Sequence, residues 1–437
     1  MSSENHSHFA EVAESNARRR TPVDLDVRLL RFFVVVFVLN TCLFVLGLLR
    51  VSGLPFVEAR AIAQYAVLSA RLLDAIFLVV FALAWKRRIL VRTLDSMALW
   101  IVAIPLFIGL AINEVSVSLL SDLSMYAFFV VKVIVLRTLL DSLAQRGAME
   151  GTLGPILRFI MKVVLTLAVL AVVLGLVLSS AGLLPRYQTP VDVTLALSIA
   201  LNHHSWVSAV TLVAFAIVSA KRGLLVGSLA MALAFFVASP GNVKRKLFAL
   251  AILAGLLLGM GTQVLPRDLP WTSRLEYTVT RTQSALEGAS DLSERILILD
   301  AGRYSEATSL LRSMTTSSWL VGNGYGYRYY VSAPGERVTE LSKSVSDSHF
   351  SPLGIVSAFG VPGLIFWAIY FIPGLRPLFR YRLATRSSRI GSLTLLGIIV
   401  QSLFAYGLFL SASTPFAYAL ATVKDRQKES DTDRPSD

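Results

Sequence analysis

The chain has little cysteine and little charge for its length. Cys42 is the one cysteine among 437 residues, so neither an intramolecular disulfide nor a cysteine-based metal site can form. Charged residues make up 16% of the chain, whereas soluble domains carry about 25%. Together with 55% hydrophobic residues and a mean hydropathy of +0.65, this composition excludes an ordinary soluble domain.

Several windows of about 16 to 20 residues are almost free of charge, which approaches the length that a helix needs to cross a bilayer. The apolar runs are continuous, whereas strands of a membrane barrel alternate between apolar and polar residues. The sequence therefore predicts an all-α polytopic membrane protein with 11 or 12 transmembrane helices and one large, partly helical periplasmic loop.

The net charge of +13 and the pI of about 10.0 would suggest a nucleic-acid partner in a soluble protein. Here the basic residues flank apolar spans, as the positive-inside bias of membrane proteins predicts. We therefore expect the lipid bilayer, and no nucleic acid, as a partner.

The arginines at 18–20 and the arginine-rich stretch 376–389 predict two cytoplasmic segments. The expected order is a cytoplasmic tail (1–26), transmembrane helices (27–264), the periplasmic loop (265–350), C-terminal transmembrane helices (351–423) and a cytoplasmic tail (424–437). Spans are expected near 32–49, 65–85, 97–112, 119–140, 163–184, 224–238, 247–265, 351–372 and 392–410, with a short last crossing at 414–423.

Residues 191–220 are short for two helices and long for one, and Asn202-His203-His204-Ser205 interrupts them. We favour two short crossings broken near Asn202, which place Lys221 and Arg222 on the outer side, where they could bind an anion. The alternative is one crossing, with Lys221 and Arg222 as an ordinary cytoplasmic anchor.

His349 ends a polar run and is followed at once by an apolar segment long enough to span a bilayer. An imidazole at this boundary can accept a proton from a hydroxyl group at neutral pH. The alternative is a histidine that makes a structural hydrogen bond at the interface.

Two arginines are candidate anion ligands, because a guanidinium group binds diphosphate oxygens in a bidentate manner. They are Arg222 and Arg303, and the alternative for Arg303 is an ion pair with Glu306. Lys132 could neutralise a phosphate or reach the interface, while Arg71 and Asp74 suggest a structural pair.

Gly322-Asn323-Gly324-Tyr325-Gly326 could present backbone N–H groups to a phosphate or sugar through Gly322, Gly324 and Gly326. It lacks the lysine and hydroxyl residue of a P-loop, so a tight turn is the alternative. His203 and His204 are adjacent and point to different helix faces, so we expect no metal there.

The order of these motifs resembles the bacterial O-antigen ligase and O-antigen polymerase family. Lys221-Arg222-Gly223 opens a span, Gly302-Arg303 precedes the Gly-x-Gly segment, and Ser348-His349-Phe350 leads into Phe359-Gly360-Val361-Pro362-Gly363-Leu364. The similarity covers residues 191–372. Lys221 stands where the family has serine, and no tryptophan follows Arg303.

The resemblance implies a glycosyltransferase of the cytoplasmic (inner) membrane whose active site faces the periplasm. The donor would be a glycan on undecaprenyl diphosphate, and no metal or other cofactor would be needed. His349 would activate the acceptor hydroxyl, while Arg222 and Arg303, with Lys221 nearby, would bind the departing diphosphate. One base opposite the leaving group implies inversion at the sugar carbon.

The acceptor would be a second glycan in a polymerase or lipid A–core in a ligase, and we favour a polymerase slightly. A chain-length regulator or other polysaccharide-assembly proteins are candidate partners. The rival class is a non-catalytic transporter of polysaccharide or lipid, which predicts charged residues within spans and internal symmetry.

Overall fold

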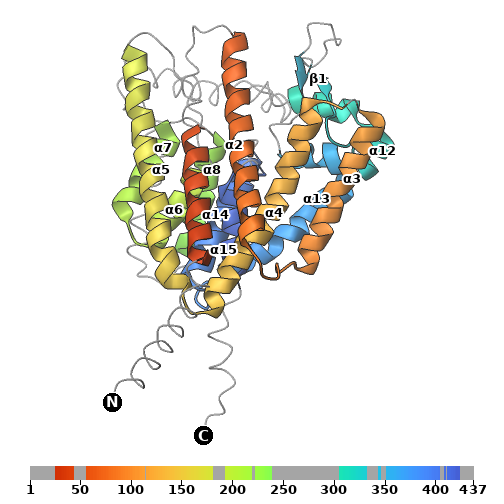
Figure 1. Cartoon of the computed structure of the whole chain (residues 1–437). Coiled ribbons are helices and arrows are strands. Elements are labelled where there is room, and N and C mark those ends of the chain that lie inside the picture. Colours follow the sequence, from red (N-terminus) through yellow and green to blue (C-terminus); the bar gives the residue numbers. More distant parts are fainter. Residues whose placement is uncertain are drawn as a thin grey trace, which may run out of the picture.

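The computed structural model describes residues 25–43, 56–113, 115–180, 192–218, 222–238, 305–331, 343–345, 351–403, 408–409 and 411–423. These residues form helices, together with one small two-stranded hairpin (Figure 1). The expectation of a helical protein is confirmed for this part of the chain.

The first helix covers residues 25–43, and a later one covers residues 305–313. The others are α2 (Phe56–Ala84), α3 (Thr93–Ile112), α4 (Val117–Gln145), α5 (Met149–Ser180), α6 (Asp192–Asn202), α7 (Trp206–Val218), α8 (Arg222–Ala238), α12 (Thr316–Val321), α13 (Ser351–Phe379), α14 (Arg386–Ser402) and α15 (Ser413–Thr422). Strands β1 (Tyr329–Val331) and β2 (Lys343–Val345) pair antiparallel, with Tyr329 opposite Val345.

Four described helices are long and apolar enough to cross a membrane: Thr93–Ile112, Ser118–Gln145, Met149–Val173 and Ser351–Phe379. Large apolar side chains point outward from them, such as Trp100 and Phe107 on α3 and Phe159 on α5. Such side chains are stable next to lipid and costly in water. We conclude that the protein is a helical membrane protein.

Two short helices, α6 and α15, form the centre of the bundle, since every residue of each is buried. They pack on α14, and α5 and α4 cover them further (Figure 1). At 1.5 Å per residue they are only about 15 Å long, about half of the hydrocarbon thickness. The short last crossing expected at 414–423 is therefore a buried half-length helix.

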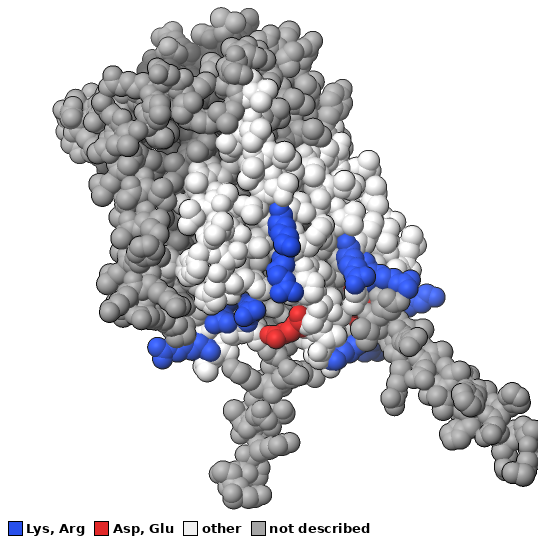
Figure 2. Space-filling model, turned by 90° about the vertical axis from the view of Figure 1, so that its left-hand side faces the viewer, with Lys and Arg blue, Asp and Glu red and all other residues white. Residues whose placement is uncertain are grey.

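Arginines gather at one end of the bundle, which we call the basic end. There, Arg87 and Arg146 lie 3.6 and 3.1 Å from Asp26, which is at the start of the first helix. Arg92, before α3, and Arg376, near the end of α13, line a common cavity at this end. Figure 2 shows lysine and arginine side chains over the lower half of one face, with an acidic patch among them and largely uncharged surface above.

Helix positions agree with the expected spans in places and differ in others. Residues 203–205 separate α6 from α7, where the sequence predicted a break. Helix α5 begins at Met149, well before the expected start at 163, because Arg158 and Lys162 interrupt the charge-free window without interrupting the helix. The expected span at 247–265 and most of the expected periplasmic loop lie outside the described residues.

Candidate functional site

The structure describes only part of the predicted site. Arg222 is the first residue of α8, and its backbone alone is described. Lys221, Arg303 and His349 lie outside the described residues. The helix over 305–313 begins just after Arg303, and α13 begins just after His349, so their neighbours in the chain can be placed.

Helix α8 runs antiparallel to α14, which fixes the end at which Arg222 lies. Near the end of α8, Phe235 packs on Tyr381 in the turn before α14, with ring centroids 6.3 Å apart. Nearer its start, an added Cβ on Gly227 would lie 2.5 Å from the carbonyl oxygen of Gly397. Because the turn at Tyr381 belongs to the basic end, Arg222 lies at the opposite end of α8.

The segment Gly322–Gly326, which we call the glycine segment, is wedged among α3, α4 and α13. Its three glycines have positive φ angles of 80°, 75° and 79°. An added Cβ would meet Ala358 of α13 at Gly322, Gly109 of α3 at Gly324, and Leu119 of α4 at Gly326. Glycine is needed at these positions for both its backbone conformation and its small size.

Most backbone N–H groups of the glycine segment donate to protein acceptors. The N–H of Asn323 donates to the Ser357 carbonyl at 2.7 Å, and that of Tyr325 to the Pro105 carbonyl at 3.0 Å. The N–H of Gly326 donates to Asp122 Oδ2 at 2.9 Å. This geometry is that of an anchor between helices, and direct binding of substrate by the glycines stays a prediction.

Tyr325 is the side chain that holds the glycine segment in the membrane domain. It is fully buried, and its hydroxyl donates to the carbonyl of Val102 in α3 at 2.9 Å. Its ring stacks on Tyr126 of α4 at 5.7 Å and meets Phe359 of α13 edge-on at 5.9 Å. The aromatic residue between two glycines therefore joins three helices.

The chain before and after the glycine segment lies at the same end, opposite the basic end. Glu306, buried in the helix over 305–313, accepts a hydrogen bond from the Tyr329 hydroxyl of β1 at 3.1 Å. Asn113, at the end of α3, donates to the carbonyls of Asn323 and Tyr325 at 3.0 Å each. In Figure 1, β1 and α12 lie beside the upper ends of α3 and α4, away from α15.

Two buried ion pairs inside the bundle join helices that are distant in sequence. Lys132 of α4 donates to Asp74 of α2 at 2.7 Å, and Arg71 lies 3.8 Å from the same carboxylate. Arg137 of α4 pairs with Asp95 of α3, which also accepts a hydrogen bond from Tyr370. The expected pair of Arg71 and Asp74 is present, but sequence reasoning missed both partners on α4.

Asp192, at the start of α6, is a further buried carboxylate that the sequence reading did not single out. It accepts hydrogen bonds from Thr41 at 2.6 Å, Ser413 at 2.5 Å and Ser411 at 3.4 Å. Ser413 opens α15, so the first turns of two half-length helices meet at this carboxylate. Its only sequence signal was one acidic residue ahead of an apolar run.

At the basic end, two titrating groups are shifted by their surroundings. Burial lowers the pKa of His203, and the nearby charges of Arg386 and Arg158 lower it further. Burial raises the pKa of Tyr381 to about 12, opposed by Arg389. The neutral Tyr381 hydroxyl donates to Asn202 Oδ1 at 3.1 Å and so ties α6 to the turn between α13 and α14.

Within the described ranges, no group of three or more His, Cys, Asp or Glu side chains is arranged to hold a metal ion. That the reaction needs no metal stays a prediction. No protein-family model, curated protein or solved structure matches the chain.

Proposed function

We propose that the protein is a membrane glycosyltransferase of surface polysaccharide biosynthesis. It transfers a glycan from undecaprenyl diphosphate to a sugar hydroxyl on the periplasmic face of the bacterial inner membrane, with inversion and without a cofactor. The proposal rests on the motif order in the sequence and on the placement of the described chain around those motifs. We favour a polymerase, with a ligase acting on lipid A–core as the alternative.

The observation that carries the proposal is that three distant stretches share one end of the bundle. The start of α8 at Arg222, the helix that follows Arg303 and the start of α13 after His349 all lie opposite the basic end. By the positive-inside bias, the basic end is cytoplasmic, so the predicted site lies on the outer side.

In this scheme, His349 removes the proton from the acceptor hydroxyl as that oxygen attacks the sugar carbon of the donor. The bond between that carbon and the diphosphate oxygen breaks, and negative charge develops on the diphosphate. Arg222 and Arg303 neutralise this charge, which lowers the barrier because fixed cations need no reorganisation. The glycine segment, through Tyr325, holds the outer loop against α3, α4 and α13.

The experiment is to replace His349 by alanine in cells that make the polysaccharide, with His204→Ala as a matched control. His204 is exposed and lies in the turn between α6 and α7, at the opposite end of the bundle. Loss of long chains with retention of single-unit lipopolysaccharide supports the polymerase. Accumulation of lipid-linked polymer supports the ligase, and normal glycan products with normal protein levels would contradict catalysis.

A transporter is the second candidate function, because Asp192 lies where the half-length helices α6 and α15 begin. Buried carboxylates at such helix breaks form ion or substrate sites in many transporters. Asp192→Asn separates the two candidates. A transporter loses export while lipid-linked glycan builds up on the cytoplasmic side, whereas a transferase that folds normally keeps its glycan products, because Asp192 is not part of its predicted site.

A further inference from the structure

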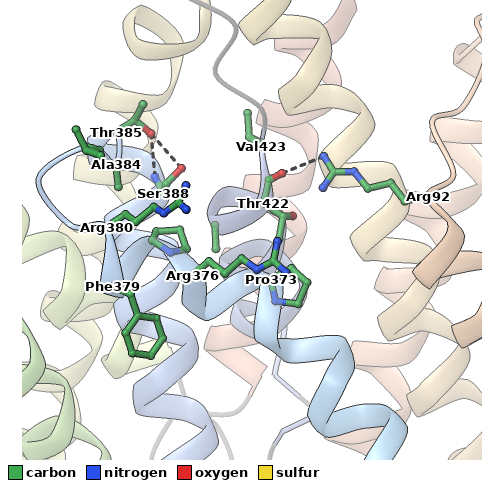
Figure 3. Close-up of a pocket in the computed structure, with 13 residues that line it drawn as sticks. Arg92, Pro373, Arg376, Phe379, Arg380, Ala384, Thr385, Ser388, Thr422 and Val423 are labelled. Atoms are coloured by element: carbon green, nitrogen blue, oxygen red, sulfur yellow. Dashed lines mark hydrogen bonds between the residues drawn. The ribbon is translucent and has the colours of Figure 1, made fainter. Parts of the chain in front are cut away.

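A cavity of about 630 Å³ opens at the basic end, between the ends of α13 and α15, the start of α14 and the segment before α3 (Figure 3). Its polar lining comes from Arg92, Arg376, Arg380, Thr385 and Ser388, with the backbone at Thr422. The volume is within the range of small-molecule sites. The cavity is at the opposite end from the predicted glycosyl-transfer site.

Three guanidinium groups belong to this cavity, and one of them is held in place. Arg92 Nη2 donates to the carbonyl of Thr422 at 2.9 Å and lies 3.4 Å from Asp141 Oδ2. Arg376, in the last turn of α13, and Arg380, in the turn that follows this helix, are exposed and form no ion pair with a described acidic side chain. The cavity thus has an excess of positive charge.

The start of α14 adds to the attraction for an anion. Thr385 caps this helix and accepts a hydrogen bond from the N–H of Ser388 at 3.3 Å. The first turn of a helix carries a partial positive charge, which favours a phosphate nearby. In Figure 3, Thr385, Ser388 and Arg380 lie on one side of the cavity, and Arg92 with Thr422 lies on the other.

The rim of the cavity is apolar and exposed. This favours a lipid over a free anion, because only a lipid has apolar chains that can contact the rim. Phe379 is 89% exposed and Leu383 is 67% exposed, and both line the cavity. Phe379 is the last residue of α13, a helix long and apolar enough to cross a membrane, and Leu383 lies in the turn after it. Bulky apolar groups next to cations at a helix end suit a headgroup together with the first part of its acyl chains.

We propose that this cavity binds the phosphate headgroup of an anionic phospholipid in the leaflet next to the basic end. Arg376 and Arg380 pair with the phosphate, Arg92 closes the inner side, and Phe379 and Leu383 contact the acyl chains. The proposal needs only that the bundle spans a membrane, so it holds or fails independently of glycosyl transfer.

The test uses the purified full chain in detergent and measures bound lipid by native mass spectrometry. The probes are dioleoylphosphatidylglycerol and dioleoylphosphatidylcholine, which share acyl chains and differ in headgroup charge. The protein should bind the anionic lipid at least roughly ten times more tightly. Equal binding of the two lipids would overturn the proposal.

The variant Arg376→Gln/Arg380→Gln should weaken binding of phosphatidylglycerol by roughly thirtyfold, because it removes two arginine contacts to the charged headgroup. The matched control is Arg382→Gln/Arg386→Gln, which removes the same charge from exposed neighbours that do not line the cavity. Its binding should change less than about threefold. Equal losses in both variants would mean diffuse attraction and would overturn a defined site.

A second pair of measurements distinguishes a lipid from a free phosphate. Phe379→Ser/Leu383→Ser should weaken lipid binding while the arginines remain, and inorganic phosphate at millimolar concentration should not displace the lipid. Displacement by phosphate with no effect of the two serines would identify a free-anion site and overturn the lipid assignment. All variants must keep the elution volume and melting temperature of the parent protein.

Discussion

Gly322 and Gly360 interlock the end of α12 with the first third of α13. An added Cβ on Gly360 would lie 2.6 Å from the carbonyl oxygen of Leu320, and one on Gly322 would strike the carbonyl of Ala358. Both residues have an extended ψ angle with a positive φ angle, of 80° at Gly322 and 72° at Gly360, a region that is essentially closed to other residues. The break in α13 at Gly360 is thus where the loop backbone docks.

This docking predicts that Gly360→Ala is strongly destabilising. The backbone strain costs about 1–3 kcal/mol and the clash with Leu320 adds about 1–3 kcal/mol. Thermal unfolding of the purified protein measures the effect. Gly154→Ala is the matched control, because a Cβ there meets nothing within 4 Å and lies inside α5. It should stabilise by about 0.5–1 kcal/mol, and equal melting temperatures for the two variants would contradict the docking.

The pair of Lys132 and Asp74 predicts a non-additive double-mutant cycle. Lys132→Met leaves the buried carboxylate with Arg71, at 3.8 Å, as its cation and with the amide of Asn40, at 3.3 Å, and should cost about 3 kcal/mol. Adding Asp74→Asn removes the unpaired charge and should restore at least about 1 kcal/mol. The measurement is unfolding of both single variants and the double variant, each assayed also for glycan products.

The activity readout in that cycle separates phosphate neutralisation, which the sequence suggested for Lys132, from the structural pair with Asp74. If the lysine only pairs with Asp74, the double variant regains glycan synthesis along with stability. A double variant that is stable but inactive would instead favour neutralisation of a phosphate by Lys132.

The sequence predicted the helical class and several helix positions because long apolar runs have few other stable structures. It predicted the break between α6 and α7, since Asn202 to Ser205 are polar residues inside an apolar run. It did not predict that α6 and α15 are wholly buried, because an apolar residue facing lipid and one facing protein have the same hydropathy.

The polar contacts between helices could not be predicted from the sequence for a different reason. Asp95 and Arg137 are 42 residues apart, and Asp192 and Ser413 are 221 apart, so no local spacing marks either pair. The glycine segment was recognised, but its amides have acceptors on α3, α4 and α13 that no sequence pattern reveals. The convergence of Arg222, Arg303 and His349 stays a prediction.

His203 predicts that acid destabilises the basic end. Its pKa is lowered by burial and by Arg386, Arg158 and His204, so the folded protein binds this proton less readily than the unfolded chain. The stability that neutral His203 contributes is fully present above the ordinary histidine pKa of about 6.5. It is lost as the pH falls below that value toward the lowered pKa of the folded protein. Melting temperatures measured between about pH 7.5 and about pH 5, a range that brackets the ordinary histidine pKa, test this loss of stability.

His203→Gln should flatten that pH dependence, since the titrating group is gone. His204→Asn is the control: this exposed neighbour has a φ angle of 55°, which asparagine tolerates. It should keep the acid sensitivity of the parent protein. The same slope in all three proteins would show that another group senses the pH.

The antiparallel packing of α8 on α14 predicts that Arg222 and Arg382 are on opposite sides of the membrane. Cysteine labelling tests this directly, because Cys42 is the one native thiol and Cys42→Ser gives a clean background. In intact cells with a permeable outer membrane, a membrane-impermeant maleimide should label Arg222→Cys. Arg382→Cys, in the exposed turn after α13, should react only after the inner membrane is opened. Labelling of both from the same side would reverse α8 and remove Arg222 from the site that contains His349.

Because the two cysteines differ only in position, their comparison in one strain also controls for expression and for leakage of the reagent.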